Sequence, residues 1–310
     1  MARRVSIINF KGGVGKTTLA FQLASGLARF HRSRVLLVDM DHQSSLSIVC
    51  LTAQNWTNLV QKNRTVDAIF KPFIGQSTAL PGTEIIEKKA IKQAYNSNYD
   101  KLDIVPASLG LDDVEIDLTA SHHGNAIHSE WDKRTLLCRW IEETGVDKEY
   151  DYIIFDCPPA TKIVSQNALA ASHGYIIPVI PESVMERGAP HLVAMIRNGI
   201  DSKLNALKTF GTPRAAHVQN TKLIGLVITR IKTHGPAQSG YIDDHTQHLG
   251  SLQRQWGNSL IKPYIEEGTG VSQALAAGLP VYERSSTQNV GGRGIDTMFR
   301  ELTDTLQPLI

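Results

Sequence analysis

The sequence has 310 residues, of which 42% are hydrophobic and 20% charged, and its formal net charge is +2. This composition is typical of a globular protein and excludes a disordered chain. The charge balance alone does not indicate a nucleic-acid partner, although it allows a local basic patch. No apolar run is long enough to span a bilayer, and Cys50, Cys138 and Cys157 lack metal-ligand spacing. We therefore expect a cytoplasmic protein with reduced thiols and no signal peptide.

Short apolar segments rich in β-branched residues alternate with longer helical patterns along the chain. Segments that are apolar throughout are typical of strands buried on both faces of a sheet. The predicted strands are Val5–Ile8, Val35–Val38, Leu102–Val105, Tyr152–Phe155, Tyr175–Ile180 and Leu223–Ile228, and the predicted helices include Thr17–Phe30, Gln166–Ala171 and Ala189–Phe210. Strand–helix–strand repetition predicts right-handed crossovers and an α/β fold with a doubly wound, mostly parallel sheet flanked by helices.

The domain organisation is predicted to be simple. Neither an internal repeat nor a Pro- or Ser-rich linker interrupts the pattern, so we predict one domain over residues 1–310. Stretches near 52–100, 120–133 and 233–257 depart from the alternation and are predicted to be insertions. In sheets of this kind, phosphate-binding residues lie at the carboxyl ends of the strands.

The first predicted strand is followed by Asn-Phe-Lys-Gly-Gly-Val-Gly-Lys-Thr-Thr at residues 9–18, and then by a helix. Glycines let backbone N–H groups converge on phosphate oxygens, and the helix presents its positive end to them. In such a loop Lys16 reaches the β- and γ-phosphates and Thr17 ligates Mg²⁺. The flanking strand and helix favour a phosphate-binding P-loop over a glycine-rich turn without a ligand. The predicted nucleotide-binding residues are Lys11, Gly12, Gly13, Val14, Gly15, Lys16, Thr17 and Thr18.

Two other predicted strands end in carboxylates. Asp39 and Asp41 follow Val35–Val38, and residues two apart at a strand end project to the same side. Asp156 closes Tyr152–Phe155, an apolar strand ended by an acid as in the Walker B motif, and a double proline then stops the strand. We predict that Asp156 holds Mg²⁺ through water or through Thr17.

The string Lys-Gly-Gly-Val-Gly-Lys-Thr-Thr, with Phe10 where the common P-loop has glycine, resembles the deviant Walker A ATPases, and the chain is similar to their ParA family. The resemblance implies that Lys11 reaches across a dimer interface to the partner's nucleotide and acts in catalysis with Lys16. It also implies that Asp39 lies near the metal and that Asp41 orients or deprotonates the attacking water. At residue 42 a histidine replaces the family's usual proline.

Later segments resemble the family less specifically. Strings at residues 225–230 and 263–281 match segments around the adenine base in relatives, so Thr229 and Pro263 are predicted to bind nucleotide. Glu115 is expected to be structural. The candidates for DNA contact lie on the predicted helix Ala189–Phe210, and a solvated helix face is the competing interpretation. These candidates are Arg197, Lys203 and Lys208, whereas Glu266 and Glu267 stand near where relatives have arginine.

The resemblance implies an ATP-hydrolysing switch with ATP and Mg²⁺ as cofactors. The ATP state would be a homodimer that binds double-stranded DNA non-specifically, associates with the nucleoid and positions a plasmid, a chromosome region or a protein assembly. A ParB-like or cargo-adaptor protein would activate it. The alternatives are a MinD-like positioning ATPase without DNA binding and a metabolic phosphoryl-transfer enzyme on the same loop. Residues 300–310 form a short end with two acids and Pro308, which argues against a MinD-type membrane helix.

Overall fold

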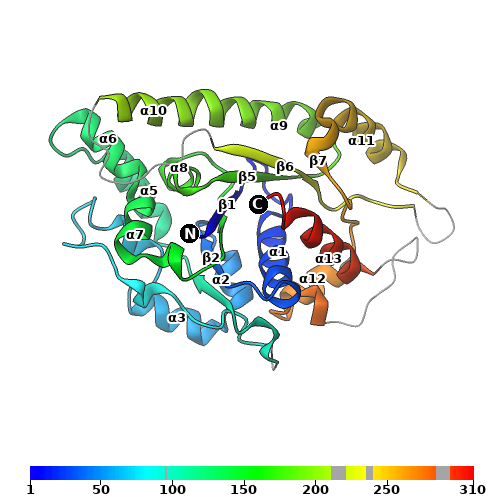
Figure 1. Ribbon diagram of the computed structural model, residues 1–310, viewed down its shortest axis with the longest axis horizontal. Helices are drawn as coiled ribbons and strands as arrows, with labels where there is room; N and C mark the ends of the chain where they lie inside the picture. The colour runs from blue at the N-terminus through cyan, green and yellow to red at the C-terminus, as the bar shows by residue number, and fades with distance from the viewer. Residues whose placement is uncertain (95, 211–220, 235–239, 284–293) are drawn as a thin grey trace.

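One parallel sheet forms the centre of the protein (Figure 1). The computed structural model describes residues 1–94, 96–210, 221–234, 240–283 and 294–310. Over these residues the sheet has seven strands in the order β3-β2-β4-β1-β5-β6-β7. The strands are β1 (Arg3–Ile7), β2 (Val35–Asp39), β3 (Leu102–Val105), β4 (Tyr152–Asp156), β5 (Gly174–Val179), β6 (Lys222–Ile228) and β7 (Leu260–Ile261).

All six predicted strands form, which confirms the α/β fold with a parallel sheet. Every residue of β2, β3, β4 and β5 is buried, and this burial on both faces explains why their sequences are apolar throughout. The edge strand β7 was not predicted. Its two residues are too few to produce a recognisable pattern.

Helices cover both faces of the sheet and bury a separate core on each. Along β4, Ile153 and Phe155 join one core while Tyr152 and Ile154 join the other, because successive strand residues point to opposite faces. The first core includes side chains of α7 and α8, and the second includes those of α1 and α13. The helices are α1 (Lys16–Phe30), α2 (Ser45–Cys50), α3 (Ala53–Gln61), α4 (Asp67–Phe70), α5 (Leu111–Ala120), α6 (Ala126–Arg134), α7 (Leu136–Thr144), α8 (Ile163–Ala171), α9 (Ser183–Met195), α10 (Ser202–Thr209), α11 (Asp243–Trp256), α12 (Thr269–Ala276) and α13 (Ile295–Leu306).

The helix expected at Ala189–Phe210 begins six residues earlier, at Ser183, so the predicted start was wrong. Pro190 lies inside α9. A π-helical segment, Ile196–Asp201, then joins α9 to α10 without a break in the backbone spiral. The result is one long helix across the outside of the sheet (Figure 1).

Two of the expected insertions contact opposite ends of this long helix (Figure 1). Stretch 120–133 contains most of α6, whose Glu130 forms an ion pair of 3.0 Å with Lys203 on α10. Stretch 233–257 contains α11, whose His248 lies 2.8 Å from Glu186 on α9. Residues 235–239 of that stretch lie outside the described residues. Stretch 52–100 contains α3 and α4.

The three cysteines are buried free thiols. Burial raises the pKa of Cys50, Cys138 and Cys157, and for Cys157 the neighbouring Asp156 carboxylate raises it further. All three therefore behave as small apolar core residues.

Candidate nucleotide-binding site

The loop between β1 and α1 has the backbone of a phosphate-binding loop. Gly13 and Gly15 have φ of 73° and 82°, which side chains with a Cβ rarely adopt. Gly12 has open space where a Cβ would be, so a ligand can approach the backbone closely. These conformations turn the chain sharply into the first residue of α1, Lys16.

Three carbonyl oxygens of this loop accept hydrogen bonds from side chains. The Lys16 ammonium donates to the Lys11 carbonyl at 3.2 Å. From the end of β6, the Thr229 hydroxyl donates to the Val14 carbonyl at 2.7 Å and the Arg230 guanidinium to the Gly13 carbonyl at 2.8 Å. These bonds hold the loop in one conformation, and its backbone N–H groups are the predicted phosphate donors.

Lys16 is the buried cation of the site, with 7% of its surface exposed. Burial lowers the pKa of its ammonium, and the carboxylates of Asp156 and Asp41 oppose that effect. The ammonium therefore lies among the two acids that the sequence placed at separate strand ends. A desolvated cation in this position interacts strongly with phosphate oxygens.

Asp39 and Asp156 are register partners at the ends of the neighbouring strands β2 and β4. Both are buried, and burial together with their mutual repulsion raises the pKa of Asp156 well above its usual range. Among the described residues, neither carboxylate oxygen of Asp156 has a hydrogen-bond partner, although the nearby Thr17 side chain partly offsets its raised pKa. A buried orphaned carboxylate beside a threonine hydroxyl fits a hard divalent cation such as Mg²⁺.

Asp39 has a different environment from Asp156, because backbone and side-chain donors surround it. Its carboxylate accepts from the Ser47 N–H at 2.9 Å, the Ser47 hydroxyl at 2.7 Å and the Asp41 N–H at 3.2 Å. These bonds fix the turn that carries Asp41. Asp39 thus lies beside the predicted metal position with its oxygens already hydrogen-bonded, whereas those of Asp156 remain available to a metal.

Asp41 lies on this turn with 8% of its surface exposed. It accepts from the Gln43 N–H at 3.0 Å, and the His42 imidazole nitrogen Nδ1 lies 3.7 Å from the same oxygen. The carboxylate is therefore held in place but still accessible, as a group that positions a water molecule needs to be. Its proposed contact is with water, which distinguishes it from Asp156.

Lys11 is half-exposed and forms an ion pair with Glu182, the residue just before α9. Its backbone N–H donates to the Asn9 side chain at 3.0 Å. The Asn9 amide in turn donates to the Pro178 carbonyl at 2.7 Å. Lys11 is thus directed along the protein surface in this single chain, and its predicted contact with a partner's nucleotide requires release from Glu182.

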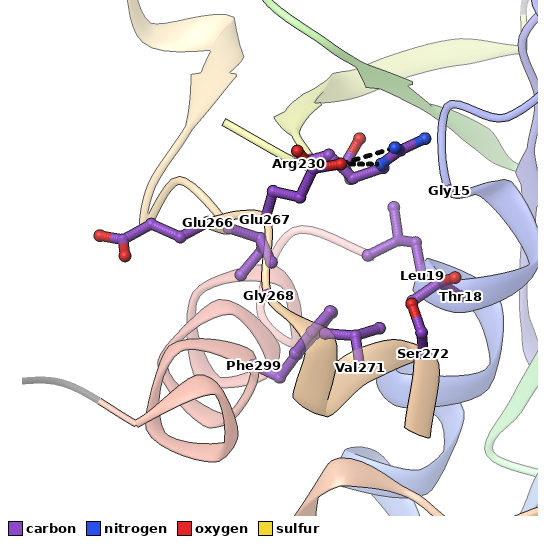
Figure 2. A pocket seen from close by; sticks show the side chains of 12 residues that line it. Gly15, Thr18, Leu19, Arg230, Glu266, Glu267, Gly268, Val271, Ser272 and Phe299 are labelled. Atoms are coloured by element: carbon purple, nitrogen blue, oxygen red, sulfur yellow. Dashed lines mark hydrogen bonds and ion pairs between the residues drawn. The ribbon is translucent and has the colours of Figure 1, made fainter. Parts of the chain in front are cut away.

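A cavity of about 320 Å³ lies beside the loop (Figure 2). Thr229, predicted to bind nucleotide, lines it, whereas Pro263 does not; residues 265–268 line it instead. Figure 2 shows Arg230 extended toward Glu267, with which it makes an ion pair of 2.6 Å. The cavity has the position and size for the nucleoside of a nucleotide whose phosphates occupy the loop.

The three DNA-contact candidates have different surroundings. Arg197 is exposed on the π-helical segment, and Lys208 is partly buried near the end of α10. Lys203 forms an ion pair with Glu130, which also pairs with Lys133 and Arg134. Burial opposes the charged form of Glu130, but these cations outweigh it and hold the pKa of Glu130 at about 2, so one charged carboxylate is shared by three cations. Arg284 and Arg293, other basic positions near the carboxyl end, lie outside the described residues.

Sequence reasoning assigned no role to two residues that the structure places in the site. Glu182 pairs with Lys11, and Arg230 links the loop to Glu267. The only signal for Arg230 was its position after Thr229 at the end of a strand. Nothing in the sequence connects Glu182 with a loop that lies far away along the chain.

Comparison with known proteins identifies the family. The family model for the AAA domain matches residues 2–209. The chromosome partitioning protein ParA of Myxococcus xanthus is 31% identical over 207 residues, which cover 66% of this chain and 62% of that protein. The chain belongs to the ParA family of partitioning ATPases. As a ParA-family ATPase it carries the P-loop and acidic strand ends described above.

Solved structures confirm the fold of this ParA-family chain. A plasmid partition protein from Borrelia burgdorferi B31 bound to AMPPNP has a TM-score of 0.66 and 19% identity, with 100% of this chain and 98% of that chain covered. Cobyrinic acid a,c-diamide synthase from Mycobacterium smegmatis with bound ADP and magnesium has a TM-score of 0.63 and 18% identity, with 99% and 94% covered. The fold alone therefore does not separate partition from metabolic chemistry. In the described part of the chain, no helix combines the length and apolarity needed to cross a membrane.

The buried acids give a prediction for stability. Asp156→Asn should raise the melting temperature of the metal-free protein by about 2–4 °C, or about 1 kcal/mol, because it removes one charge of a repelling buried pair. Added Mg²⁺ should stabilise the parent protein and have a much smaller effect on the variant. Thermal unfolding with and without MgCl₂ measures both effects. Asp112→Asn, an exposed acid, is the control, and equal stabilisation by Mg²⁺ of parent and Asp156→Asn would remove Asp156 from the metal site.

Proposed function

We propose that the protein is an ATP-hydrolysing switch of ParA type, with ATP and Mg²⁺ as its cofactors. The observation that supports this most is the convergence of Lys16, Asp41 and Asp156 at one P-loop, from three separate strand ends. The chain covers 62% of the length of the Myxococcus relative, so its activity and partners as a whole protein are proposed here and not transferred.

Each residue has a role that follows from its surroundings. Lys16 neutralises charge on the β- and γ-phosphates, and the loop N–H groups bind their oxygens. Asp156 and Thr17 would hold Mg²⁺, which would supply charge neutralisation at the phosphates. Asp41 orients the attacking water and accepts its proton. Thr229 and Arg230 keep the loop in the conformation that makes these contacts possible.

The ATP state is proposed to be a homodimer in which Lys11 contacts the partner's nucleotide. Exchange of the Glu182 carboxylate for phosphate oxygens is favourable because the phosphates carry more charge. The Lys11–Glu182 pair lies at the surface, where ion pairs contribute only about 0–1 kcal/mol, so its release costs little. Dimerisation would thus depend on the nucleotide and not on the protein surface alone.

The dimer is proposed to bind double-stranded DNA non-specifically, to associate with the nucleoid and to position a cargo with a ParB-like or adaptor activator. Arg197, which is exposed, supports a phosphate contact better than Lys203, which is already paired with Glu130. The cargo is a plasmid, a chromosome region or a protein assembly. Turnover raised by DNA plus a partner protein supports this proposal, whereas turnover raised only by a metabolite would favour a phosphoryl-transfer enzyme.

Substitution of Asp41 should separate ATP binding from hydrolysis. Asp41→Ala should retain MgATP binding, because the carboxylate acts on water and not on the phosphates. Hydrolysis should fall at least about a hundredfold, the usual effect of losing a positioned base. Calorimetry measures binding and phosphate release measures turnover, with Asp112→Ala as an exposed control. Normal turnover in Asp41→Ala would assign the water-orienting role to another residue.

Substitution of Lys11 tests the contact between subunits. Lys11→Ala should bind MgATP as a monomer and lose ATP-dependent dimerisation, measured by light scattering. Glu182→Gln is the matched control, because it breaks the same ion pair while leaving the lysine available to a partner. It should dimerise at least as well as the parent. If Lys11→Ala dimerises normally, Lys11 is only a loop residue.

DNA binding is tested by a salt titration with unrelated duplexes. Affinity in the ATP state should fall steeply with added salt and hardly depend on sequence, as expected for phosphate contacts. Arg197→Ala should reduce the salt slope by about one per protomer, and Lys203→Ala should change it less because that lysine is already paired with Glu130. Equal, negligible binding with ATP and ADP would exclude DNA from the proposal while leaving the ATPase unaffected.

A further inference from the structure

The Arg230 side chain joins the P-loop to the wall of the neighbouring cavity. Its Nη1 donates to the Gly13 carbonyl at 2.8 Å, while Nε and Nη2 donate to the Glu267 carboxylate at 3.1 and 2.6 Å. Arg230 and Glu267 line the cavity, whereas Gly13 does not. Figure 2 shows the pair along one side of the cavity, with Val271 and Phe299 on the opposite side. The guanidinium therefore connects two parts of the site that fit different parts of a nucleotide.

The backbone of Arg230 is shaped for this contact. Its φ of 55° lies in the left-handed region, which residues with a Cβ rarely adopt. In a continuing strand, the side chains of Thr229 and Arg230 would point to opposite sides. Here both reach the same loop, Thr229 at the Val14 carbonyl and Arg230 at the adjacent Gly13 carbonyl. Because a strained conformation persists only where surrounding contacts hold it, the contact between Arg230 and the loop is a built feature of the site.

The backbone of Glu267 is held by the end of the sheet. Its N–H donates to the Ile231 carbonyl at 2.9 Å, and the Ile231 N–H donates to the Ile265 carbonyl at 3.0 Å. The segment around Glu267 thus continues the parallel pairing beyond β6. The P-loop, in contrast, is rich in glycine, the residue that loses most conformational freedom when it becomes ordered. The Arg230–Glu267 pair therefore ties a loop of high intrinsic freedom to a fixed backbone.

The strength of this tie depends on what fills the cavity. The side chains of Arg230 and Glu267 are 51% and 34% exposed, and water weakens an ion pair with that exposure. A nucleoside in the cavity covers the pair and lowers the local dielectric constant, which strengthens the attraction between the two charges. A stronger pair holds the guanidinium more firmly on the Gly13 carbonyl. Occupation of the cavity and the conformation of the P-loop are therefore linked.

We propose that Arg230 is a positioning residue that couples binding of the nucleoside to binding of the phosphates. The nucleoside strengthens the Arg230–Glu267 pair, and the pair holds Gly13 in the conformation that binds phosphate. Because such coupling is reciprocal, phosphates in the loop strengthen nucleoside binding by the same factor. The site thereby favours a complete nucleotide over a free polyphosphate. This role rests on the proposed nucleotide-binding function and specifies how two parts of that site act together.

The test divides the nucleotide into two pieces, adenosine and magnesium pyrophosphate. Calorimetry with the full chain measures the affinity for magnesium pyrophosphate with and without saturating adenosine. In the parent, adenosine should tighten pyrophosphate binding at least about fivefold, the lower end of ordinary coupling between sites. Arg230→Met removes the guanidinium, and Glu267→Gln removes the carboxylate charge while keeping the shape. In both variants the effect of adenosine should fall below about twofold, because the coupling is lost.

This measurement separates coupling from direct contact with the nucleoside. If Arg230 only touched the nucleoside, Arg230→Met would bind adenosine more weakly, but saturating adenosine would still tighten pyrophosphate binding as in the parent. That result would overturn the inference. Arg34→Met is the matched control, because Arg34 is 52% exposed and pairs with Asp151 at the amino-terminal edge of the sheet. It should keep the coupling of the parent.

A charge swap tests whether the contact with Gly13 is needed. Arg230→Glu combined with Glu267→Arg restores an ion pair but sets a carboxylate against the Gly13 carbonyl oxygen. The coupling should therefore stay lost, and its recovery would contradict a role through Gly13. Absence of any effect of adenosine in the parent would also overturn the inference. Hydrolysis of MgATP is measured on the same samples. Its absence in the parent contradicts the proposed function, while the pyrophosphate titrations still decide the coupling.

Discussion

The rest of the site depends on one constraint, the meeting of two buried carboxylates at the ends of β2 and β4. Parallel pairing sets Asp39 directly opposite Asp156, so the sheet itself brings like charges together. Such a pair is costly unless neighbours compensate. Ser47 donates to Asp39, and Lys16 approaches from α1. Hydrogen bonds from Ser47 and Asp41 offset the burial of Asp39 in part, whereas in the described part of the chain the Asp156 oxygens accept none.

The sequence predicted the features that are local or periodic. The strands could be predicted because burial on both faces makes their sequences apolar throughout. The P-loop could be predicted because its positive φ angles require glycine. Contacts between distant segments could not be predicted, because neither Glu182 nor Arg230 differs in sequence from an ordinary surface residue. The helix expected from Ala189 begins at Ser183, and Pro190 lies inside it.

Helices α6 and α11, which lie in two of the predicted insertions, place charged groups beside the long helix. Glu130 on α6 pairs with Lys203, and on α11 His248 lies between Glu186 and Asp244. Those two carboxylates raise the pKa of His248. Charged groups therefore link each end of the long helix to α6 or α11, whereas Arg197 lies exposed in its middle.

The burial of the three native thiols makes site-specific fluorescent labelling of this protein simple. Maleimide reagents attack accessible thiolates, and burial suppresses the thiolate form of Cys50, Cys138 and Cys157. A fluorophore can therefore be attached at one engineered surface position, such as Phe210→Cys, without first removing the native cysteines. Because the native cysteines remain in place, the labelled protein keeps its original core packing while single molecules are tracked.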